Sequence, residues 1–458
     1  MDLVVAGAGA AGCAAALAAA EQGLRVMIVD ADEQFRTRSN TSRTAAMIPA
    51  AGTRWQHAAG IDDFPQRFHD DIMRKTGGQA DATVSRALVD VSAVLVEWMA
   101  DGCGVPLSLV TEFRYPGHTA DRCHTVPDRD GSTMHAHLLA AVDDHDGIEL
   151  MAPTALRTVG TNDAGAATEA HITLPGGEED VLDVGGVVLA TNGYAADADL
   201  VARYAPEIAG GVYFGSPFSR GDALRIGRDL GADSAYLDAY QGHGSVAHPH
   251  AILLTWATVM HGAVLVNAEG RRFGDETEGY SGFGARTLAQ PGAVAWMVYD
   301  ARIHDAVRTF ASYRALEASG AIAWAGDIDE LAATIGAGVE TLTATLEAAR
   351  AAAEDRLDDP HGRTEWGPTP LPPYAAVRVT GALFHTQGGL RVDGEGRVLR
   401  DDGTAITGLY AAGGAAIGIS GHGADGYLAG NGLLSALGLG YLAGRAAAAA
   451  GTAEPARR

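Results

Sequence analysis

Residues 3–12, LVVAGAGAAG, decide the fold of this chain. The apolar run LVVA is typical of a parallel strand that is buried on both faces. Gly7, Gly9 and Gly12 follow it in GxGxxG spacing, and an alanine-rich stretch then has the composition of a helix. The first glycine permits a tight turn, the second lets a pyrophosphate approach the backbone, and the third allows the helix to pack closely on the strand.

A second strand follows that helix and completes the pattern. The stretch RVMIVD ends at Asp30, where a carboxylate can accept hydrogen bonds from a ribose hydroxyl. The N-terminus of the intervening helix would stabilise the phosphate charge. A glycine-rich turn without a ligand is the alternative, but the surrounding strands and helix argue against it. The pattern predicts that a dinucleotide is held by Gly7, Gly9, Ala10, Ala11, Gly12 and Asp30.

Four later segments favour FAD over NAD. Small residues follow apolar strands or open a helix in SNTSRTAAMIPAAGT (39–53), GGVVLATNGY (185–194), GLYAAGG (408–414) and AGNGLLSALGLG (429–440). A second strand-to-glycine pair near the C-terminus indicates that the chain returns to complete the cofactor site. We expect further cofactor contacts at Thr44, Ala45, Ala46, Gly52, Thr191, Asn192, Gly193, Gly413, Asn431, Leu433 and Leu434.

Size and charge limit the classes of function. At 458 residues the chain can bury a large core and is expected to divide into two domains. Its net charge of −24 argues against nucleic acid or an anionic membrane as the main partner. An anionic substrate would need arginines placed locally at its site.

Cysteines and apolar runs indicate the compartment. Cys13, Cys103 and Cys123 show no metal-ligand spacing, so we expect reduced thiols, a cytoplasmic location and no metal site. No basic segment precedes the first strand, and no signal peptide is expected. The apolar run at 432–450 is interrupted by glycines and one arginine, which predicts a buried helix rather than a membrane span. The last residues, 451–458, are expected to fray.

Two further stretches make the chain resemble a known flavoprotein family: GAVLVNAEGRRFGDET (262–277) and FHTQGGLRVDGEGRVL (384–399). The family contains fumarate reductases, succinate dehydrogenase flavoprotein subunits and 3-ketosteroid dehydrogenases. The resemblance covers nearly the whole chain and implies an α/β fold, in which an inserted α+β capping domain closes over a Rossmann-type FAD-binding domain. It places the FAD-binding domain at 1–242 and 384–458, and the capping (substrate) domain at 243–383. The family's covalent flavin histidine has no counterpart here, so noncovalent FAD is expected.

The catalytic pattern of the fumarate reductases is matched only in part. Its substrate-contacting positions correspond to Gln241, His243, Thr255 and His385. Its proton-relay positions, however, fall on Trp256 and Val259. Tyr280 replaces the acid arginine, and a carboxylate-binding arginine is replaced at or near Tyr427. The resemblance therefore does not imply fumarate reduction.

The 3-ketosteroid dehydrogenase branch fits the loop at 270–284 better, because GRRFGDETEGYSGFG is similar to its GRRFxxExxxYxxFG pattern. In that branch the loop tyrosine is the catalytic base, which implies this role for Tyr280. Tyr115, in a Tyr-Pro pair, resembles a second active-site tyrosine. Tyr427 resembles a third that polarises the substrate ketone, but its spacing departs by one residue, which leaves His422 as an alternative donor.

The role of Tyr280 depends on its ionisation. As a base it needs a pKa well below the ordinary value of about 10. A nearby cation would lower the pKa by favouring the phenolate, and the candidates are Arg272, Arg286 or a protonated histidine. In the reverse direction a neutral tyrosine already serves as an acid. Simple ring packing is the alternative for Tyr280, and a surface ion pair is the alternative for Arg272.

These observations predict a soluble FAD-dependent oxidoreductase that acts on CH–CH groups beside a carbonyl or carboxylate. We favour α,β-dehydrogenation of a compact cyclic ketone, with Tyr280 as base and flavin N5 as hydride acceptor. One alternative is a fumarate reductase-like alkene reductase with an external electron donor. Another is a non-catalytic electron-transfer flavoprotein subunit. The expected partners are a small carbonyl or carboxylate substrate and an external electron acceptor or donor, without nucleic acid or a membrane span.

Overall fold

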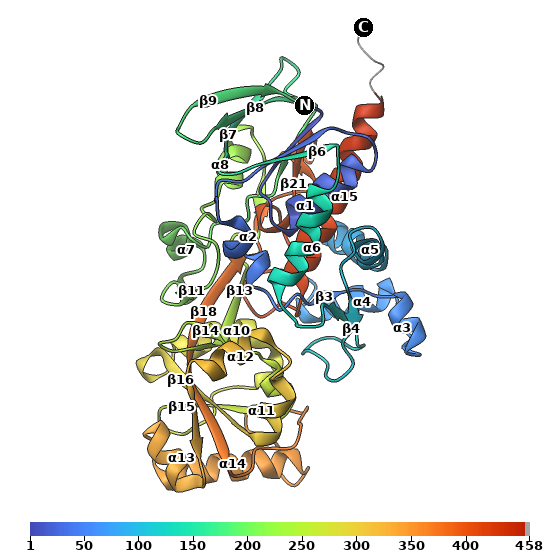
Figure 1. Ribbon diagram of the computed structural model, residues 1–458. Helices are drawn as coiled ribbons and strands as arrows, with labels where there is room; N and C mark the ends of the chain where they lie inside the picture. The colour runs from blue at the N-terminus through green and yellow to red at the C-terminus, as the bar shows by residue number, and fades with distance from the viewer. Residues whose placement is uncertain (454–458) are drawn as a thin grey trace.

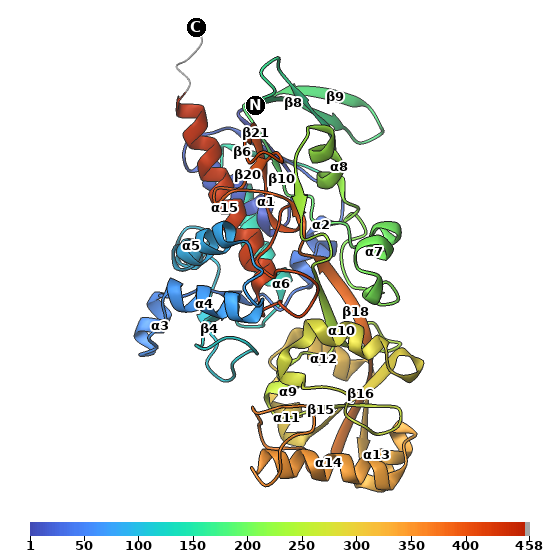
Figure 2. The ribbon, with the colours of Figure 1, turned by 180° about the vertical axis from the view of Figure 1, so that it is seen from behind.

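The computed structural model describes residues 1–453, which form an upper and a lower lobe stacked end to end (Figure 1). The described part of the chain begins and ends in the upper lobe, and the segments coloured yellow and light orange make up most of the lower lobe. The view from behind shows the same division (Figure 2). The predicted fraying at 451–458 falls mostly on residues outside the described part of the chain, since the last helix continues to Ala453.

A six-stranded sheet in the order β20-β21-β10-β1-β2-β6 forms the centre of the upper lobe. Five strands run parallel, and only the edge strand β20 runs antiparallel to its neighbour. The short strands LVVA and VMIV are buried along their whole length, as expected for parallel strands covered on both faces. The strands are β1 (Leu3–Ala6), β2 (Val26–Val29), β6 (Ile148–Met151), β10 (Val187–Leu189), β20 (Arg397–Leu399) and β21 (Ala405–Ala411). This sheet confirms the predicted Rossmann-type fold.

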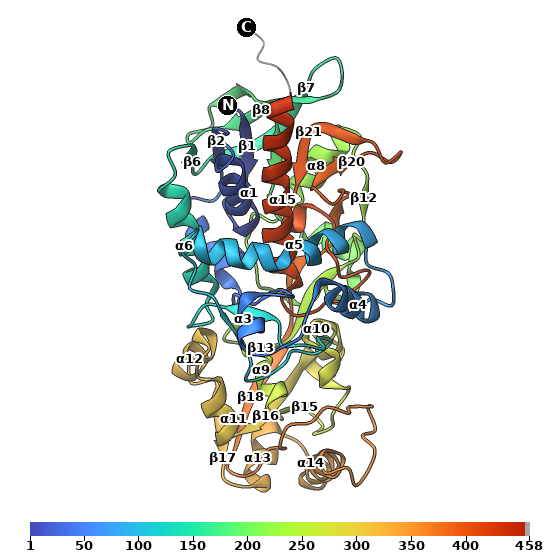
Figure 3. The same cartoon turned by 90° about the vertical axis from the view of Figure 1, so that its right-hand side faces the viewer.

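Helix α1 (Ala10–Ala20) packs along α15 (Asn431–Ala453) beside this sheet. Glycines make the close approach possible, because a Cβ on Gly440 or Gly444 would lie 2.3 or 2.2 Å from a carbonyl oxygen of α1. Helix α5 (Ala82–Asp101) crosses α15 on its outer side (Figure 3). Although α15 is long and apolar enough to cross a membrane, 67% of its apolar window is buried, so it is a core helix as predicted.

The second large sheet belongs mainly to the lower lobe and has the order β14-β13-β18-β16-β15, with β11 and β17 also paired to β18. Its long strand β18 extends up into the upper lobe (Figure 1). The predicted boundaries at 242/243 and 383/384 fall inside β13 and β18, which pair with each other. The strands are β11 (Val212–Tyr213), β13 (Tyr240–Ala247), β14 (Ile252–Leu253), β15 (Val264–Asn267), β16 (Val294–Asp300), β17 (Ile322–Ala325) and β18 (Tyr374–Thr386).

Smaller elements complete the two lobes. Three small sheets contain β3 (Ile48–Pro49), β4 (Ser108–Leu109) and β5 (Cys123–Thr125); β7 (Ala155–Thr161), β8 (Ala167–Thr173) and β9 (Glu179–Asp183); and β12 (Ser234–Ala235) with β19 (Gly389–Leu390). The other upper-lobe helices are α2 (Phe35–Arg38), α3 (Arg54–Ala58), α4 (Pro65–Lys75), α6 (Gly131–Asp143), α7 (Ala198–Tyr204) and α8 (Asp222–Asp229).

The lower lobe surrounds its strands with six helices among the described residues (Figure 2). They are α9 (Ala257–Met260), α10 (Tyr280–Leu288), α11 (Ala301–Val307), α12 (Ala311–Ala318), α13 (Ile328–Ile335) and α14 (Val339–Ala353). Short 3₁₀ turns occur at η1 (Thr41–Arg43), η2 (Pro206–Ile208), η3 (Glu276–Glu278), η4 (Pro291–Ala293) and η5 (Gly413–Ala415).

Candidate active site

A cavity of about 580 Å³ runs from the carboxyl ends of the parallel strands to the junction of the two lobes. Its upper end is lined by the turn after β1, the end of β2 and the turn after β10. Its lower end is lined by residues of β13, α10 and the segment before α15. Ligands of open parallel sheets bind at the carboxyl ends of the strands, so the position of this cavity identifies it as the main candidate site.

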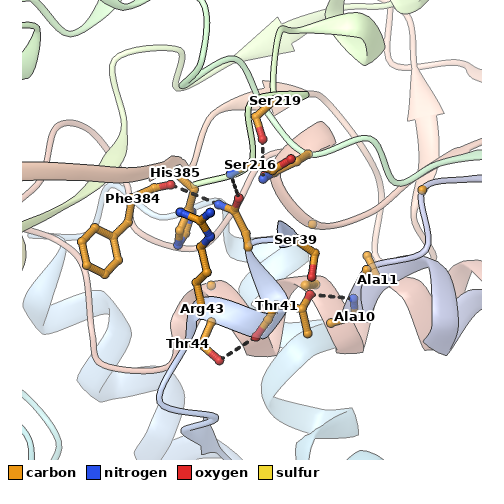
Figure 4. Close-up of a pocket in the computed structure, with 18 of the residues that line it drawn as sticks. Ala10, Ala11, Ser39, Thr41, Arg43, Thr44, Ser216, Ser219, Phe384 and His385 are labelled. Carbon is orange, nitrogen blue, oxygen red and sulfur yellow. Dashed lines mark hydrogen bonds between the residues drawn. The ribbon is translucent and has the colours of Figure 1, made fainter. Parts of the chain in front are cut away.

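The upper end has the features of a dinucleotide site. Gly7 adopts a φ of 111°, and its turn leads directly into the N-terminus of α1. Asp30 is held at the end of β2, where its carboxylate accepts the backbone N–H groups of Ala8 and Asp32 at 2.8 Å each. Burial raises the pKa of Asp30 above its ordinary value. Thr41 of η1 accepts the N–H of Ala10 at 2.9 Å, and so joins the next loop to the helix N-terminus (Figure 4).

Buried polar atoms test whether this end fits FAD. The hydroxyls of Thr154, Thr191 and Ser435 line the cavity and have no hydrogen-bond partner within the described protein. Leaving such groups unpaired costs about 1–3 kcal/mol each, so their positions indicate a polar ligand. Hydroxyls, backbone amides at a helix N-terminus and a carboxylate are suitable partners for phosphates, ribityl hydroxyls and a ribose. The donor set therefore fits FAD.

Most of the predicted cofactor residues line this cavity, namely Gly7, Gly9, Ala10, Ala11, Asp30, Thr44, Ala45, Thr191, Asn192, Gly413 and Leu433. The other predicted cofactor residues do not line it, namely Gly12, Ala46, Gly52, Gly193, Asn431 and Leu434. Gly12 packs against the turn that carries Gly7, where a Cβ would lie 1.8 Å from the Gly7 carbonyl oxygen. A glycine is therefore needed at this position to hold the turn in shape rather than to contact a ligand.

Three tyrosines meet at the lower end of the cavity. Tyr280 begins α10, and its ring centroid lies 6.4 Å from that of Tyr115 and 5.8 Å from that of Tyr427. Tyr115 comes from the loop between β4 and β5, and Tyr427 from the loop that precedes α15. All three line the cavity. The structure thus brings together three residues that are spread over more than 300 positions of the sequence.

Tyr427 has a direct partner that suits a hydrogen-bond donor. The N–H of Gly432, in the first turn of α15, donates to its hydroxyl oxygen at 3.1 Å. Since the oxygen accepts this bond, the phenol proton is free to be donated elsewhere. Burial raises the pKa of Tyr427 to about 12, so the proton is present at neutral pH.

The lowered pKa that would make Tyr280 a ready base at neutral pH is not found. Burial, with smaller contributions from Tyr427 and Tyr115, raises its pKa well above 10. The candidate cations are placed elsewhere or are neutral. Arg286 pairs with Glu278, and burial lowers the pKa of His243 to about 3. Tyr280 is consequently a neutral phenol at physiological pH.

Arg272, predicted as a catalytic residue, is buried in the lower lobe and does not line the cavity. Its guanidinium donates to Glu276 at 2.9 and 2.6 Å and to Asp359 at 2.5 Å, and it lies over the ring of Trp366. Arg363 pairs with the same glutamate at 3.1 Å. Because Glu276 belongs to the turn just before α10, this ion cluster supports the segment that carries Tyr280.

The remaining predicted residues divide in the same way; they are His385, predicted as catalytic, and Gln241, His243, Thr255 and His422, predicted to bind substrate. Gln241, His243, Thr255 and His385 line the cavity. Burial lowers the pKa of His385 to about 4, so this imidazole is neutral. His422 lies outside the cavity, with its side chain 53% exposed and paired to Asp238 at 2.8 Å. It is therefore not positioned to replace Tyr427 as the donor.

Sequence reasoning missed several lining residues in the loop after β2 and around β18. Asn40 bridges two segments, because it donates to the carbonyl of Phe384 at 3.0 Å and accepts the N–H of Ser216 at 2.7 Å. Arg43 extends from η1 toward Phe384 and His385 (Figure 4), and its guanidinium lies 5.9 Å from the ring of Phe214. The polar loop at 39–53 was the available signal, but its pattern did not show which side chains face inward.

A family model described as an FAD binding domain matches residues 2–433. The NADH:fumarate oxidoreductase of Klebsiella pneumoniae is 30% identical over 457 residues, which cover 98% of this chain and 47% of that protein. The chain thus spans about half the length of this relative. A flavocytochrome c3 fumarate reductase in an open conformation superposes with a TM-score of 0.79 at 26% identity, covering 98% of this chain and 78% of the other. A 3-ketosteroid-Δ4-(5α)-dehydrogenase from Rhodococcus jostii shares the fold, with a TM-score of 0.76 at 24% identity over 98% and 96% of the two chains.

Proposed function

From the premise that this chain belongs to the FAD-binding 2 family, we propose that it dehydrogenates the CH–CH bond beside the carbonyl of an uncharged substrate. The chain is an FAD-dependent oxidoreductase of the family that contains fumarate reductases and ketosteroid dehydrogenases. When bound, the flavin would accept a hydride from the β carbon of the substrate. The α1 N-terminus, Asp30 and the polar residues around Thr191 would hold the cofactor.

The observation that carries the proposal is the meeting of Tyr280, Tyr115 and Tyr427 where a dicarboxylate enzyme would need cations. A dicarboxylate buried here would need several paired charges, since an unpaired buried charge is strongly destabilising. Among the described residues that line this end, His243 and His385 are neutral and Arg43 is a single cation, against the two charges of a dicarboxylate, while Arg272 is committed to the lower lobe. The lower end of the cavity instead presents phenol hydroxyls, which can hydrogen-bond to an uncharged ketone.

Each tyrosine has a distinct proposed role. Tyr427 donates to the carbonyl oxygen of the substrate, because its own oxygen accepts the N–H of Gly432. This hydrogen bond stabilises the negative charge that develops as the α proton leaves. The phenolate form of Tyr280, which is the minor form at neutral pH, accepts that proton, and Tyr115 borders its ring edge-on. Because the pKa of Tyr280 is raised, its phenolate is a strong base, but only a small fraction of the protein molecules carries it at neutral pH. The reaction should therefore run faster at alkaline pH, where more of Tyr280 is ionised.

Reduction of a carbonyl-conjugated alkene is the second candidate, and the ionisation of Tyr280 favours it. The raised pKa keeps the phenol protonated at neutral pH, which is the form required to deliver a proton to the α carbon. The same residues serve both directions. A reductase would receive electrons from an external donor, and a dehydrogenase would pass them to an external acceptor.

We also propose that residues 243–383 act as the capping domain over a FAD-binding domain of residues 1–242 and 384–458, and that FAD is held noncovalently. The residues of the 39–53 loop that line the cavity include no histidine that could form the family's covalent flavin bond. The three cysteines are free and buried, which supports the proposed cytoplasmic location.

Anaerobic mixing tests the proposal. Cyclohexanone and a saturated 3-ketosteroid should bleach the oxidised flavin absorbance of the wild-type holoprotein, and succinate should not. Tyr280→Phe should bind FAD normally but bleach at least about 100 times more slowly, since it cannot accept a proton. Equal bleaching by the variant would remove Tyr280 from the mechanism. If dithionite-reduced protein is instead reoxidised by cyclohexenone alone, the reductase reading is correct, and no response in either direction would favour an electron-transfer subunit.

A further inference from the structure

Lys75 is the single lysine of the chain, and it lies at the junction of the two lobes. It is the last residue of α4 in the upper lobe, and its Nζ donates to the carbonyl oxygen of Glu278 at 2.5 Å. Glu278 ends η3 and lies two residues before Tyr280, which begins α10. The ammonium group thus contacts the turn from which Tyr280 projects.

Charged side chains enclose this contact from both lobes. Arg286 of α10 forms an ion pair with Glu278 and lies 3.8 Å from Asp425 of the upper lobe. Burial lowers the pKa of Lys75, although Asp425 and Glu278 oppose the effect. The lysine side chain is half-buried, although the hydrogen bond itself is exposed, and a cationic donor strengthens such a bond. The contact is therefore a specific link between α4 and the turn before α10.

The geometry of the three tyrosines depends on how α10 is seated. Tyr115 and Tyr427 come from upper-lobe loops, whereas Tyr280 comes from α10. Gly279 separates Glu278 from Tyr280 and has a φ of 116°; because a glycine restricts the backbone less than any other residue, this turn by itself does little to fix Tyr280. A displacement of about 1 Å at a reacting group can cost about 100-fold in rate. A contact that fixes the Glu278 carbonyl would fix the start of α10 as well.

We propose that Lys75 is a positioning residue that holds Tyr280 in register with Tyr115 and Tyr427. It acts through the main chain of Glu278 and contacts neither the substrate nor the reacting atoms. This inference rests on the proposed role of Tyr280 in proton transfer. The positioning needs a cationic hydrogen-bond donor rather than a lysine as such, so an arginine at position 75 should retain much of the activity.

Two substitutions separate positioning from general stability. Lys75→Met should lower kcat for ketone-dependent bleaching by about tenfold, with little change in KM, FAD content or unfolding temperature. Lys75→Arg, which keeps a cationic donor, should remain within about threefold of wild type. Arg86→Met removes a partly exposed cation of α5, paired to Asp90 at 3.7 Å, and serves as the matched control with unchanged kcat. A Lys75→Met protein with wild-type kcat would overturn the proposal, as would a Lys75→Arg protein no better than Lys75→Met.

The single lysine also permits a test that needs no substrate. Sulfo-NHS-acetate can modify only the N-terminal amine and Lys75, and intact mass and peptide mapping resolve the two. In the folded holoprotein Lys75 should react at least about tenfold more slowly than in urea, because its amine is engaged at the junction. Equal rates in the two states would show that the contact does not persist and would sink the inference.

Acetylated protein then links the contact to catalysis. Once Lys75 is modified, wild-type kcat should fall toward that of Lys75→Met, whereas identically treated Lys75→Arg should lose nothing because it has no lysine. If Tyr280→Phe bleaches normally while Lys75 is protected, the proposed chemistry fails but the junction contact stands. If Tyr280→Phe is inactive and Lys75 is unprotected, the chemistry stands and the positioning role fails.

Discussion

The phenol ring of Tyr280 stacks on the imidazole of His243, with ring centroids 4.7 Å apart and planes inclined by 21°. His243 in turn stacks on Phe384 at 5.2 Å, and Phe384 stacks on Phe214 at 4.9 Å. The four rings form a column along one wall of the cavity. Because His243 is neutral, the column fixes the plane of Tyr280 without supplying a charge that would ionise it.

The first prediction concerns the pH dependence of dehydrogenation. The pKa of Tyr280 is raised well above 10, so the phenolate is the minor form at neutral pH and its fraction grows about tenfold per pH unit. Dehydrogenation kcat/KM should therefore rise from pH 7 to pH 10 without a plateau. His243 and His385 titrate near pH 3 and 4 and contribute nothing in this window.

Stopped-flow bleaching across this pH range measures the effect. Alkene reduction, which uses the neutral phenol, should stay level between pH 7 and 9. A plateau in the dehydrogenation profile near pH 7 would mean that a cation does lower the pKa of Tyr280, contrary to the geometry described here.

The second prediction concerns the buried ion cluster beneath α10. Glu276 is fully buried and pairs with Arg272 and Arg363 at 2.6 and 3.1 Å. Glu276→Gln leaves two buried guanidinium groups without their shared carboxylate and should reduce the free energy of unfolding by about 3–5 kcal/mol. Urea unfolding at pH 7 measures the loss. Glu269→Gln, at an exposed pair 3.9 Å from Arg271, should change it by less than about 0.5 kcal/mol.

The same cluster predicts a pH dependence of stability. Burial alone would raise the pKa of Glu276, but Arg272 and Arg363 hold it below the ordinary value of 4.5. Its stabilising contribution is thus fully present above pH 4.5 and is lost as the pH falls through the lower pKa of the folded state. The stability difference between wild type and Glu276→Gln should shrink below pH 4.5. A difference that stays constant down to acid pH would contradict the ion-pair explanation.

The fold could be predicted because its signal is local. The turn at Gly7 and Gly9, between two short apolar strands, specifies the first βαβ unit without reference to any distant residue. The sequence also predicted which tyrosines form the site, since Tyr115, Tyr280 and Tyr427 do lie close together. Their shared environment depends on two loops and the start of α10, and could not be inferred from spacing.

The sequence could not show which partners the charged side chains would take. Arg272 lies eight residues from Tyr280, close enough in the chain to suggest a catalytic cation. Its actual partners include Asp359, which is 87 residues away, and only the tertiary structure brings them together. Likewise His422 lies in a glycine-rich segment near Tyr427, yet its partner Asp238 holds it at the surface.

The third prediction concerns the contact between α1 and α15. A Cβ at Gly444 would lie 2.2 Å from the backbone oxygen of Ala15, which cannot move without displacing α1. Gly444→Ala should therefore lower the unfolding free energy by about 1–3 kcal/mol despite its better helix propensity. At Gly451 of the same helix the nearest atom is a leucine methyl at 3.6 Å, so Gly451→Ala should be neutral or stabilising by up to about 1 kcal/mol. Equal effects of the two substitutions in thermal unfolding would count against this packing.

The last prediction uses a buried hydroxyl that lacks a partner. Thr191 follows β10 and lines the cavity, and its Oγ1 makes no hydrogen bond within the described protein. Thr191→Val keeps the shape and removes the hydroxyl. In the apoprotein this removes an unsatisfied polar group and should leave stability unchanged or raise it by up to about 1 kcal/mol. In the holoprotein it should remove a hydrogen bond to FAD and weaken binding by about fivefold to tenfold.

A contact with FAD would make Thr191→Val weaken the holoprotein while leaving the apoprotein unchanged or more stable. A residue that only packs would change the stability of both forms in the same direction. Fluorescence titration gives the FAD Kd, and thermal unfolding with and without FAD gives the two stabilities. Thr334→Val serves as the control, because its hydroxyl donates to the Glu330 carbonyl within α13, away from the cavity. That variant should leave the FAD Kd unchanged. An unaltered Kd in Thr191→Val would mean that this hydroxyl does not contact the cofactor.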